Sequence, residues 1–156
     1  MKFERKSEPK LEDIKEIEKL WKNSLSDDFI QFYMKYSGYE LPYYEYTVDV
    51  LYQSEGAPDI DAEEDLFCFS NLEDIKRLWK YTGPSHIQHY LDHFEHPKSI
   101  VDPEALVAFA EGDSGVFYIS TKGRTKDKIL YADNGDFGIG LVADNLESFM
   151  KKLNID

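Results

Sequence analysis

The sequence predicts an α+β fold, in which a largely antiparallel sheet of about five or six strands is flanked by helices. In the first half of the chain, apolar residues recur at spacings of three and four, which is typical of helices that pack on one face. In the last third, short apolar runs are joined by short Gly-containing links that suit antiparallel neighbours. The 156 residues fit one domain, 1–156, which can bury a core without metals or disulfides.

Two helices are predicted before residue 40. The first follows Pro9, a residue tolerated in a first helical turn. Its apolar stripe is expected to contain Leu11, Ile14, Ile17, Leu20 and Trp21. The second begins at Ser26, because Asp27 and Asp28 suit the positive end of a helix, and it ends at Gly38. Its inward residues are expected to be Phe29, Phe32, Tyr33 and Tyr36.

The region after these helices predicts two strands separated by a long loop. Residues 47–52 alternate between apolar and polar and indicate a strand. Residues 66–69 indicate a second, short strand, in which the single Cys68 is expected to be a small buried thiol. The polar stretch 53–65 between them is predicted to be a surface loop.

Two further helices are predicted in the middle of the chain. Ser70 and Glu73 have the spacing of a capping box that opens a helix. The Gly83–Pro84 pair breaks that helix, and a second one begins at Pro84 and ends before Pro97.

The C-terminal third predicts three strands and a final helix. The strands are expected at 106–110, 116–121 and 129–132, and the glycines of 135–140 are expected to lie in a loop. Asp144 and Glu147 can form the capping box of the last helix. Its core-facing residues are expected to be Leu146, Phe149, Met150 and Leu153.

This C-terminal order of strand, acidic Gly turn, strand and capped helix resembles the SUKH superfamily, which cell-wall-assembly regulators share with many bacterial immunity proteins. The segments that carry the resemblance are 105–119, 131–138 and 142–153. The sequence departs from the family where Leu25-Ser26 replaces a Leu-Pro pair and where Gly38-Tyr39 replaces a Gly pair. The resemblance spans about Ser24 to Leu153 and implies binding rather than catalysis.

The charge of the chain restricts its partners. Thirty-one acidic residues against eighteen basic ones give a formal net charge of -13. This charge repels phosphate backbones and anionic lipids, so we expect no direct binding to nucleic acid and none to membranes. It favours a basic protein partner, although net acidity also simply keeps proteins soluble. Residues 1–10 lack the apolar core of a signal peptide, and no apolar run reaches about 18 residues, so a cytoplasmic location is expected.

Two segments are candidates for contact with such a partner. The acidic segment 59–65 could begin a calcium loop, but Glu64 stands where that loop requires Gly and Ser70 where it requires Glu. It is therefore either a solvated loop or a docking surface for a cationic protein. Tyr43 and Tyr44 are candidates for interface anchors or for core packing. The predicted partner-binding residues are Tyr43, Tyr44, Asp59, Asp61, Glu63, Glu64 and Asp65.

The sequence offers two weak signs of chemistry. A helix would gather all four histidines, His86, His89, His93 and His96, in one stripe, which is either a metal site or a polar face beside an apolar one. The run 112–115, Gly-Asp-Ser-Gly, resembles a protease nucleophile segment but suits a tight turn better. We therefore expect no catalytic residues, no bound metal and no cofactor.

The resemblance implies an immunity protein that neutralises a cognate protein toxin by direct binding, and the net acidity favours a toxin of a basic nuclease type. An alternative is a cell-wall or stress-regulatory scaffold that binds other proteins, and a further one is a small metal-dependent enzyme built on the histidine stripe. The sequence leaves the oligomeric state open.

Overall fold

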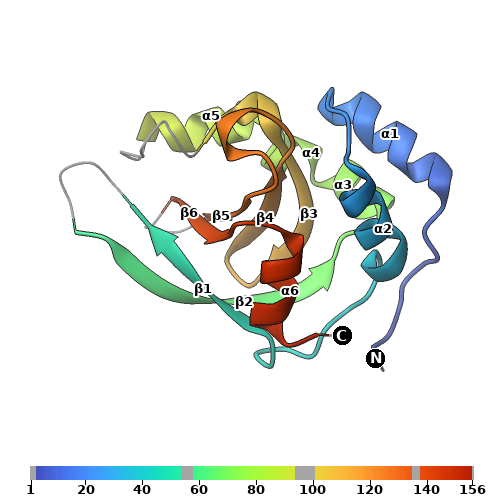
Figure 1. Cartoon of the computed structure of the whole chain (residues 1–156), viewed down its shortest axis with the longest axis horizontal. Coiled ribbons are helices and arrows are strands. Elements are labelled where there is room, and N and C mark those ends of the chain that lie inside the picture. The colour runs from blue at the N-terminus through green and yellow to red at the C-terminus, as the bar shows by residue number, and fades with distance from the viewer. Residues whose placement is uncertain (1–2, 54–57, 94–100, 135–137, 156) are drawn as a thin grey trace.

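The computed structural model describes residues 3–53, 58–93, 101–134 and 138–155. Six antiparallel strands close into a continuous sheet in chain order (Figure 1). The strands are β1 (Thr47–Tyr52), β2 (Ile60–Phe69), β3 (Leu106–Gly112), β4 (Gly115–Ser120), β5 (Ile129–Asp133) and β6 (Ile139–Ala143). The sheet closes where Leu51 of β1 pairs with Leu141 of β6. The predicted α+β fold, with a largely antiparallel sheet of about five or six strands flanked by helices, is confirmed.

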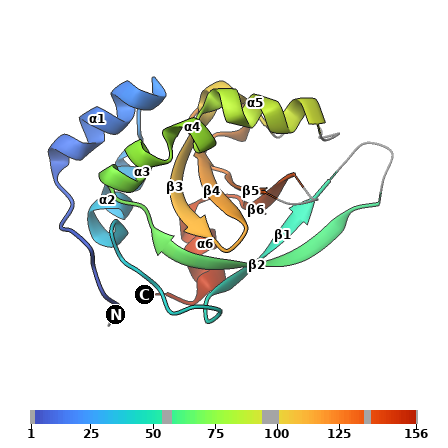
Figure 2. The same cartoon turned by 180° about the vertical axis from the view of Figure 1, so that it is seen from behind.

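Helices cover the outside of this sheet. They are α1 (Leu11–Trp21), α2 (Asp27–Tyr36), α3 (Leu72–Arg77), α4 (Trp79–Thr82), α5 (Pro84–His93) and α6 (Leu146–Leu153), with short 3-10 turns η1 (Pro103–Ala105) and η2 (Gly123–Thr125). Seen from behind, α3, α4 and α5 follow one another along one edge of the sheet (Figure 2). None of the helices in the described ranges is long and apolar enough to cross a bilayer.

Aromatic side chains join the helices to the sheet. Phe109 of β3 is buried, and its ring lies 5.5 Å from that of Phe32 of α2 and 5.7 Å from that of Phe149 of α6. Trp21 at the end of α1 packs edge-on against Trp79, with ring centroids 4.8 Å apart. Edge-to-face pairs of this kind add to the apolar area that they bury. The core therefore fixes where α2 and α6 lie on the sheet.

The two N-terminal helices largely follow the prediction. Ser26 caps α2 by accepting a hydrogen bond from the backbone of Phe29, and the chain leaves the helix through Gly38, whose φ of 86° favours glycine. All four predicted inward residues of α2 are buried. In α1 the prediction was wrong for Leu11, which is 66% exposed, and Pro9 lies before the helix, whose N-cap is Lys10.

The main correction concerns the predicted loop 53–65. Its second part, Ile60–Asp65, belongs to β2 and pairs with β1 along the whole length of that strand. The acidic residues hid this strand, because Asp and Glu have low β propensity. They are tolerated here because alternate positions face outward while Ala62, Glu64 and Leu66 face the interior.

Two helix caps also differ from the prediction. The cap of α3 is Asn71 with Asp74 rather than Ser70 with Glu73, because Ser70 is still tied to Phe109 by a backbone hydrogen bond. The last helix is likewise capped one residue later than predicted, by Asn145 instead of Asp144.

The predicted loop 135–140 ends in a sixth strand. Gly140 lies within β6, and a Cβ atom there would approach Val50 Cγ1 to 2.5 Å. The glycine therefore allows β6 to approach β1 closely where the sheet closes. Residues 135–137 lie outside the described residues.

Candidate protein-interaction site

The outward side chains of β1 and β2 form a strip of negative charge. In the antiparallel register Asp49 lies opposite Glu63, and Leu51 lies opposite Asp61. One step further along, Thr47 pairs with Asp65. We call Asp49, Asp61, Glu63 and Asp65 the acidic strip.

Charges in the acidic strip are not balanced locally. Within the described part of the chain, no Lys or Arg forms an ion pair with any of its four carboxylates. Partial burial, and then the negative charges of Asp113 and Glu63, raise the pKa of Asp65. Like charges directly opposite each other in an antiparallel pair are destabilising. The Asp49–Glu63 pairing is therefore unfavourable for the free protein and available to an incoming cation.

Aromatic rings lie at one end of this strip. Tyr43 and Tyr44 are 72% and 68% exposed, so the core-packing alternative for them is wrong. The rings pack on Phe67, the outward residue of β2 next beyond Asp65, with centroid distances of 4.7 Å and 6.0 Å. Tyr44 has a φ of 61°, which is uncommon for a non-glycine residue. We call Tyr43, Tyr44 and Phe67 the aromatic corner.

The structure separates the other two predicted contact residues. Asp59 is exposed just before β2, where its carboxylate lies 3.5 Å from Gln53 Nε2. Glu64 points into the closed sheet and is only 9% exposed, so it cannot belong to an outer docking surface. This corrects the prediction, and the reason is the alternation of a β-strand, which the assumption of a loop had removed.

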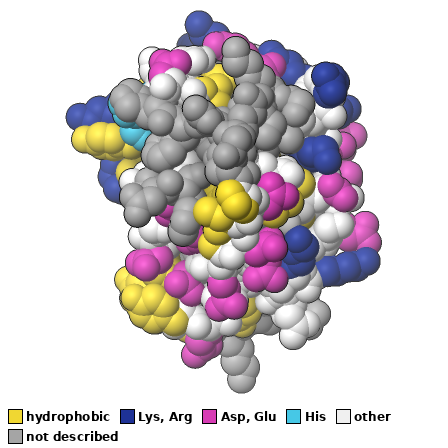
Figure 3. Space-filling view, turned by 90° about the vertical axis from the view of Figure 1, so that its left-hand side faces the viewer, with side chains coloured by type: hydrophobic (Ala, Val, Ile, Leu, Met, Phe, Trp, Pro, Cys, Tyr) yellow, Lys and Arg dark blue, Asp and Glu magenta, His cyan; other side chains and the backbone are white. Residues whose placement is uncertain are grey.

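A space-filling view shows how charged side chains are distributed on this side of the molecule (Figure 3). Figure 3 shows the molecule from the left of Figure 1, where β1 and β2 reach the edge of the structure. Acidic side chains gather across the lower half of this view, beside exposed apolar ones. Lys and Arg side chains lie mostly in its upper and right-hand parts.

The comparison with known families agrees with this fold. Residues 8–152 match the sequence model of the SMI1 / KNR4 family (SUKH-1). The chain belongs to the SUKH-1 family. The predicted resemblance to the SUKH superfamily is thereby confirmed over nearly the whole chain. No curated protein and no solved structure gives a match.

Inside the sheet, this SUKH-1 protein contains a polar network that the sequence did not indicate. Tyr52 donates to Glu64 Oε1 at 3.0 Å. Ser114, in the turn between β3 and β4, lies 3.3 Å from Glu64 Oε2, 2.7 Å from Asp133 Oδ1 and 3.3 Å from the Tyr131 hydroxyl. The run 112–115 is therefore a hairpin turn, as predicted, and its serine contacts carboxylates instead of a histidine base. Only the folded sheet brings these residues together.

The structure describes part of the predicted histidine stripe of this SUKH-1 chain. His86 and His89 of α5 stack, with ring centroids 6.0 Å apart. Burial, and then the neighbouring His89, lower the pKa of His86. His96 and the side chain of His93 lie outside the described residues. Among the described residues, no group of three or more His, Cys, Asp or Glu side chains could hold a metal ion.

Cys68 is half-buried and donates to Glu111 Oε2 at 3.3 Å. Burial, and then the Glu111 carboxylate, raise the pKa of its thiol. A thiol held in its protonated form is a weak nucleophile. Cys68 thus behaves as a packing residue, as the sequence suggested, although it is not fully buried.

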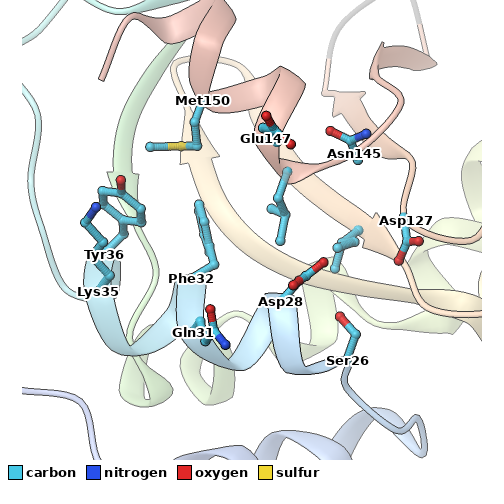
Figure 4. Close-up of a pocket in the computed structure, with 12 residues that line it drawn as sticks. Ser26, Asp28, Gln31, Phe32, Lys35, Tyr36, Asp127, Asn145, Glu147 and Met150 are labelled. Atoms are coloured by element: carbon cyan, nitrogen blue, oxygen red, sulfur yellow. The ribbon is translucent and has the colours of Figure 1, made fainter. Parts of the chain in front are cut away.

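A second surface feature of this SUKH-1 protein is a groove between α2 and α6, with a volume of about 590 Å³ (Figure 4). Figure 4 shows side chains of the two helices pointing toward each other across it. Its lining combines apolar residues such as Phe32 and Met150 with the charged residues Asp28, Asp127 and Glu147. These residues come from three distant parts of the chain, so no local pattern in the sequence marks the groove.

Proposed function

We propose that this SUKH-1 protein is an immunity protein that neutralises a cognate protein toxin by direct binding, and that the toxin is a basic, nuclease-type protein. The observation that carries the proposal is the acidic strip of β1 and β2, which lies beside the exposed aromatic corner. The strip and the corner, together with Asp59, form the surface that we assign to the toxin.

The acidic strip supplies the attraction. Complementary charge raises association rates toward about 10⁸ M⁻¹s⁻¹ or more at low salt, and this steering weakens as salt screens it. An antitoxin must reach its toxin before the toxin reaches a substrate, so fast association is the property that such a protein needs.

The aromatic corner supplies the anchor. Exposed Tyr residues offer a large contact area at a low cost in side-chain entropy, and they are enriched among the residues that dominate binding energy. Their rings can also receive Lys or Arg side chains of a basic partner through cation-π contacts. Charge would thus act on the encounter, and the rings would act on the lifetime of the complex.

The sign of the charge supports the proposal of a nuclease-type partner. A nuclease binds phosphates through a positive surface. A strip with unpaired carboxylates fits the same surface, so it would compete with nucleic acid for it. Neutralisation then needs no catalysis by the immunity protein, because blocking the substrate surface is sufficient.

The test begins with the gene next to this one. A neighbouring gene for a large protein with a variable, basic C-terminal domain would provide the candidate toxin. Purified toxin domain and this protein should form a complex, and nuclease activity should fall to zero at one equivalent. A neighbourhood without such a gene, or full nuclease activity at excess protein, would instead favour the regulatory scaffold.

A further inference from the structure

The α2–α6 groove has an apolar floor. Phe32 and Tyr36 contribute to it from α2, and Leu146 and Met150 contribute from α6. Phe32, Tyr36 and Met150 are buried, whereas Leu146 is half-buried and therefore accessible from the groove. The volume of about 590 Å³ lies within the range of ligand sites, about 300–1,000 Å³, and can take more than one side chain.

Charges are ordered along the groove. Figure 4 places Asp28 and Asp127 toward one end and Lys35 toward the other. The Lys35 ammonium lies 5.1 Å from the centre of the Tyr36 ring, in a cation-π contact. Glu147 forms an ion pair of 3.2 Å with Lys151. The side chains of Asp28 and Asp127 form no ion pair with any cation in the described ranges.

The negative end remains negative after the helix dipoles are included. The N-termini of α2 and α6 both open on this end, and each contributes about half a positive charge. The carboxylates of Asp28 and Asp127 outweigh that contribution by about one charge, and the Glu147 carboxylate is balanced by Lys151. Asp127 lies in the turn before β5, with a φ of 74°, and not in either helix that borders the groove.

We propose that the α2–α6 groove binds a short segment of a protein partner in which an apolar side chain is followed closely by Lys or Arg. The apolar side chain would enter between Phe32 and Leu146, and the cation would lie between Asp28 and Asp127. This second surface shares no residue with the acidic strip or the aromatic corner. Its existence depends on neither the identity of the toxin nor the immunity function.

The probe is a hexapeptide with blocked ends, Gly-Leu-Lys-Phe-Arg-Gly. It is titrated into the isotopically labelled full chain at low salt, and the amide resonances of the protein are followed by NMR. We expect the shifts to map to α2, α6 and the turn that contains Asp127. A second peptide with Glu in place of Lys and Arg is expected to produce no saturable shifts there.

Variants identify the charges. Asp28→Asn combined with Asp127→Asn should weaken binding of the basic peptide about three- to tenfold, which corresponds to two exposed ion pairs. Asn is chosen because it tolerates a positive φ at residue 127. The matched control is Glu12→Gln combined with Glu73→Gln, which removes two exposed acids from first helical turns elsewhere. It should leave the affinity of the peptide unchanged.

Four results would overturn the proposal. If the control variant weakens peptide binding equally, the effect comes from the net charge of the protein and not from the groove. Shifts that map to the acidic strip, or saturable binding of the acidic peptide in the groove, would contradict the assigned place or the assigned chemistry. Absence of shifts at millimolar peptide would show that the groove does not accept such a segment.

Discussion

Tyr52 donates a hydrogen bond of 3.0 Å to Glu64, a carboxyl group that is only 9% exposed inside the closed sheet. The other oxygen of Glu64 lies 3.3 Å from Ser114 Oγ, which in turn lies 2.7 Å from Asp133 Oδ1. A serine hydroxyl has one proton to donate. If Ser114 donates this proton to Asp133 through the shorter contact, its oxygen can only accept a hydrogen bond from Glu64. Glu64 must then carry a proton.

The electrostatic environment of Glu64 agrees with a proton on its carboxyl group. Burial raises the pKa of Glu64, the hydrogen bond from Tyr52 opposes the shift, and the negative charge of Asp133 adds to it. A Ser114 proton donated to Glu64 instead of Asp133 would oppose the shift as well. The net direction is upward. Below the ordinary Glu pKa of about 4.3, Glu64 is protonated in both the folded and the unfolded chain, so the folded state loses no stability. As the pH rises toward the raised pKa, the unfolded chain releases its proton first, and the folded state loses stability.

Replacement of Glu64 by Gln should therefore help the protein most at neutral pH. The amide keeps a hydrogen-bond donor and an acceptor but has no proton to release. We expect the free energy of unfolding of Glu64→Gln, relative to the parent, to increase from pH 4 to pH 7, as measured by chemical denaturation. Asp61→Asn, on the exposed side of the same strand, is the control and should show a smaller change. A difference that is constant with pH would refute the buried proton.

Individual elements show how far the sequence could predict this fold. Strand β1 and the cap of α2 are local features, so alternation and a single Ser predicted them correctly. Strand β2 was hidden because its acids have low strand propensity, and its pairing with β1 stabilises it only in the folded sheet. Because β2 was predicted to be a loop, Glu64 was expected on the surface. The alternation of β2 places it in the interior instead.

The candidate sites show the same limit more strongly. The acidic strip could be anticipated in part, since Asp61, Glu63 and Asp65 are neighbours in sequence. Asp49 joins them only through the strand register. The contact between Ser114 and Asp133, like the groove between α2 and α6, joins segments with no shared local pattern.

A metal should not be needed for folding. The core of this protein is a large apolar cluster that joins the sheet to α1, α2 and α6. A structural zinc ion would contribute on the order of 10 kcal/mol, so its removal would lower the melting temperature by tens of degrees. We expect the melting temperature to be the same with and without a chelator, and the same for His89→Ala treated in both ways. A large drop on chelation would restore the histidine stripe as a metal site.

Neutralisation of the acidic strip should act on association. Replacing Asp49, Asp61 and Glu63 with Asn or Gln should slow binding of the cognate toxin about tenfold or more at low salt and flatten its salt dependence. Dissociation should change little, because exposed charges act mainly on the encounter. The measurement is binding kinetics at two salt concentrations.

The control for this experiment is a variant with the same change in net charge. Glu12, Glu73 and Glu104 are exposed and lie outside the acidic strip, so their replacement with Gln removes three charges elsewhere. If this control slows association as much as the strip variant does, steering comes from the net charge of -13 rather than from the strip.

Truncation of the aromatic corner should have the opposite kinetic effect. Tyr43 is 72% exposed, so Tyr43→Ala removes little packing from the free protein and should leave its stability nearly unchanged. An anchoring aromatic typically contributes about 2 kcal/mol or more to an interface, and the loss is seen mainly in faster dissociation. We therefore expect dissociation from the toxin to speed up about thirtyfold. Tyr81→Ala, at a 56% exposed tyrosine of α4, is the matched control and should have no effect. Equal dissociation rates for the Tyr43 variant and the parent would place the anchor of the interface elsewhere on the molecule.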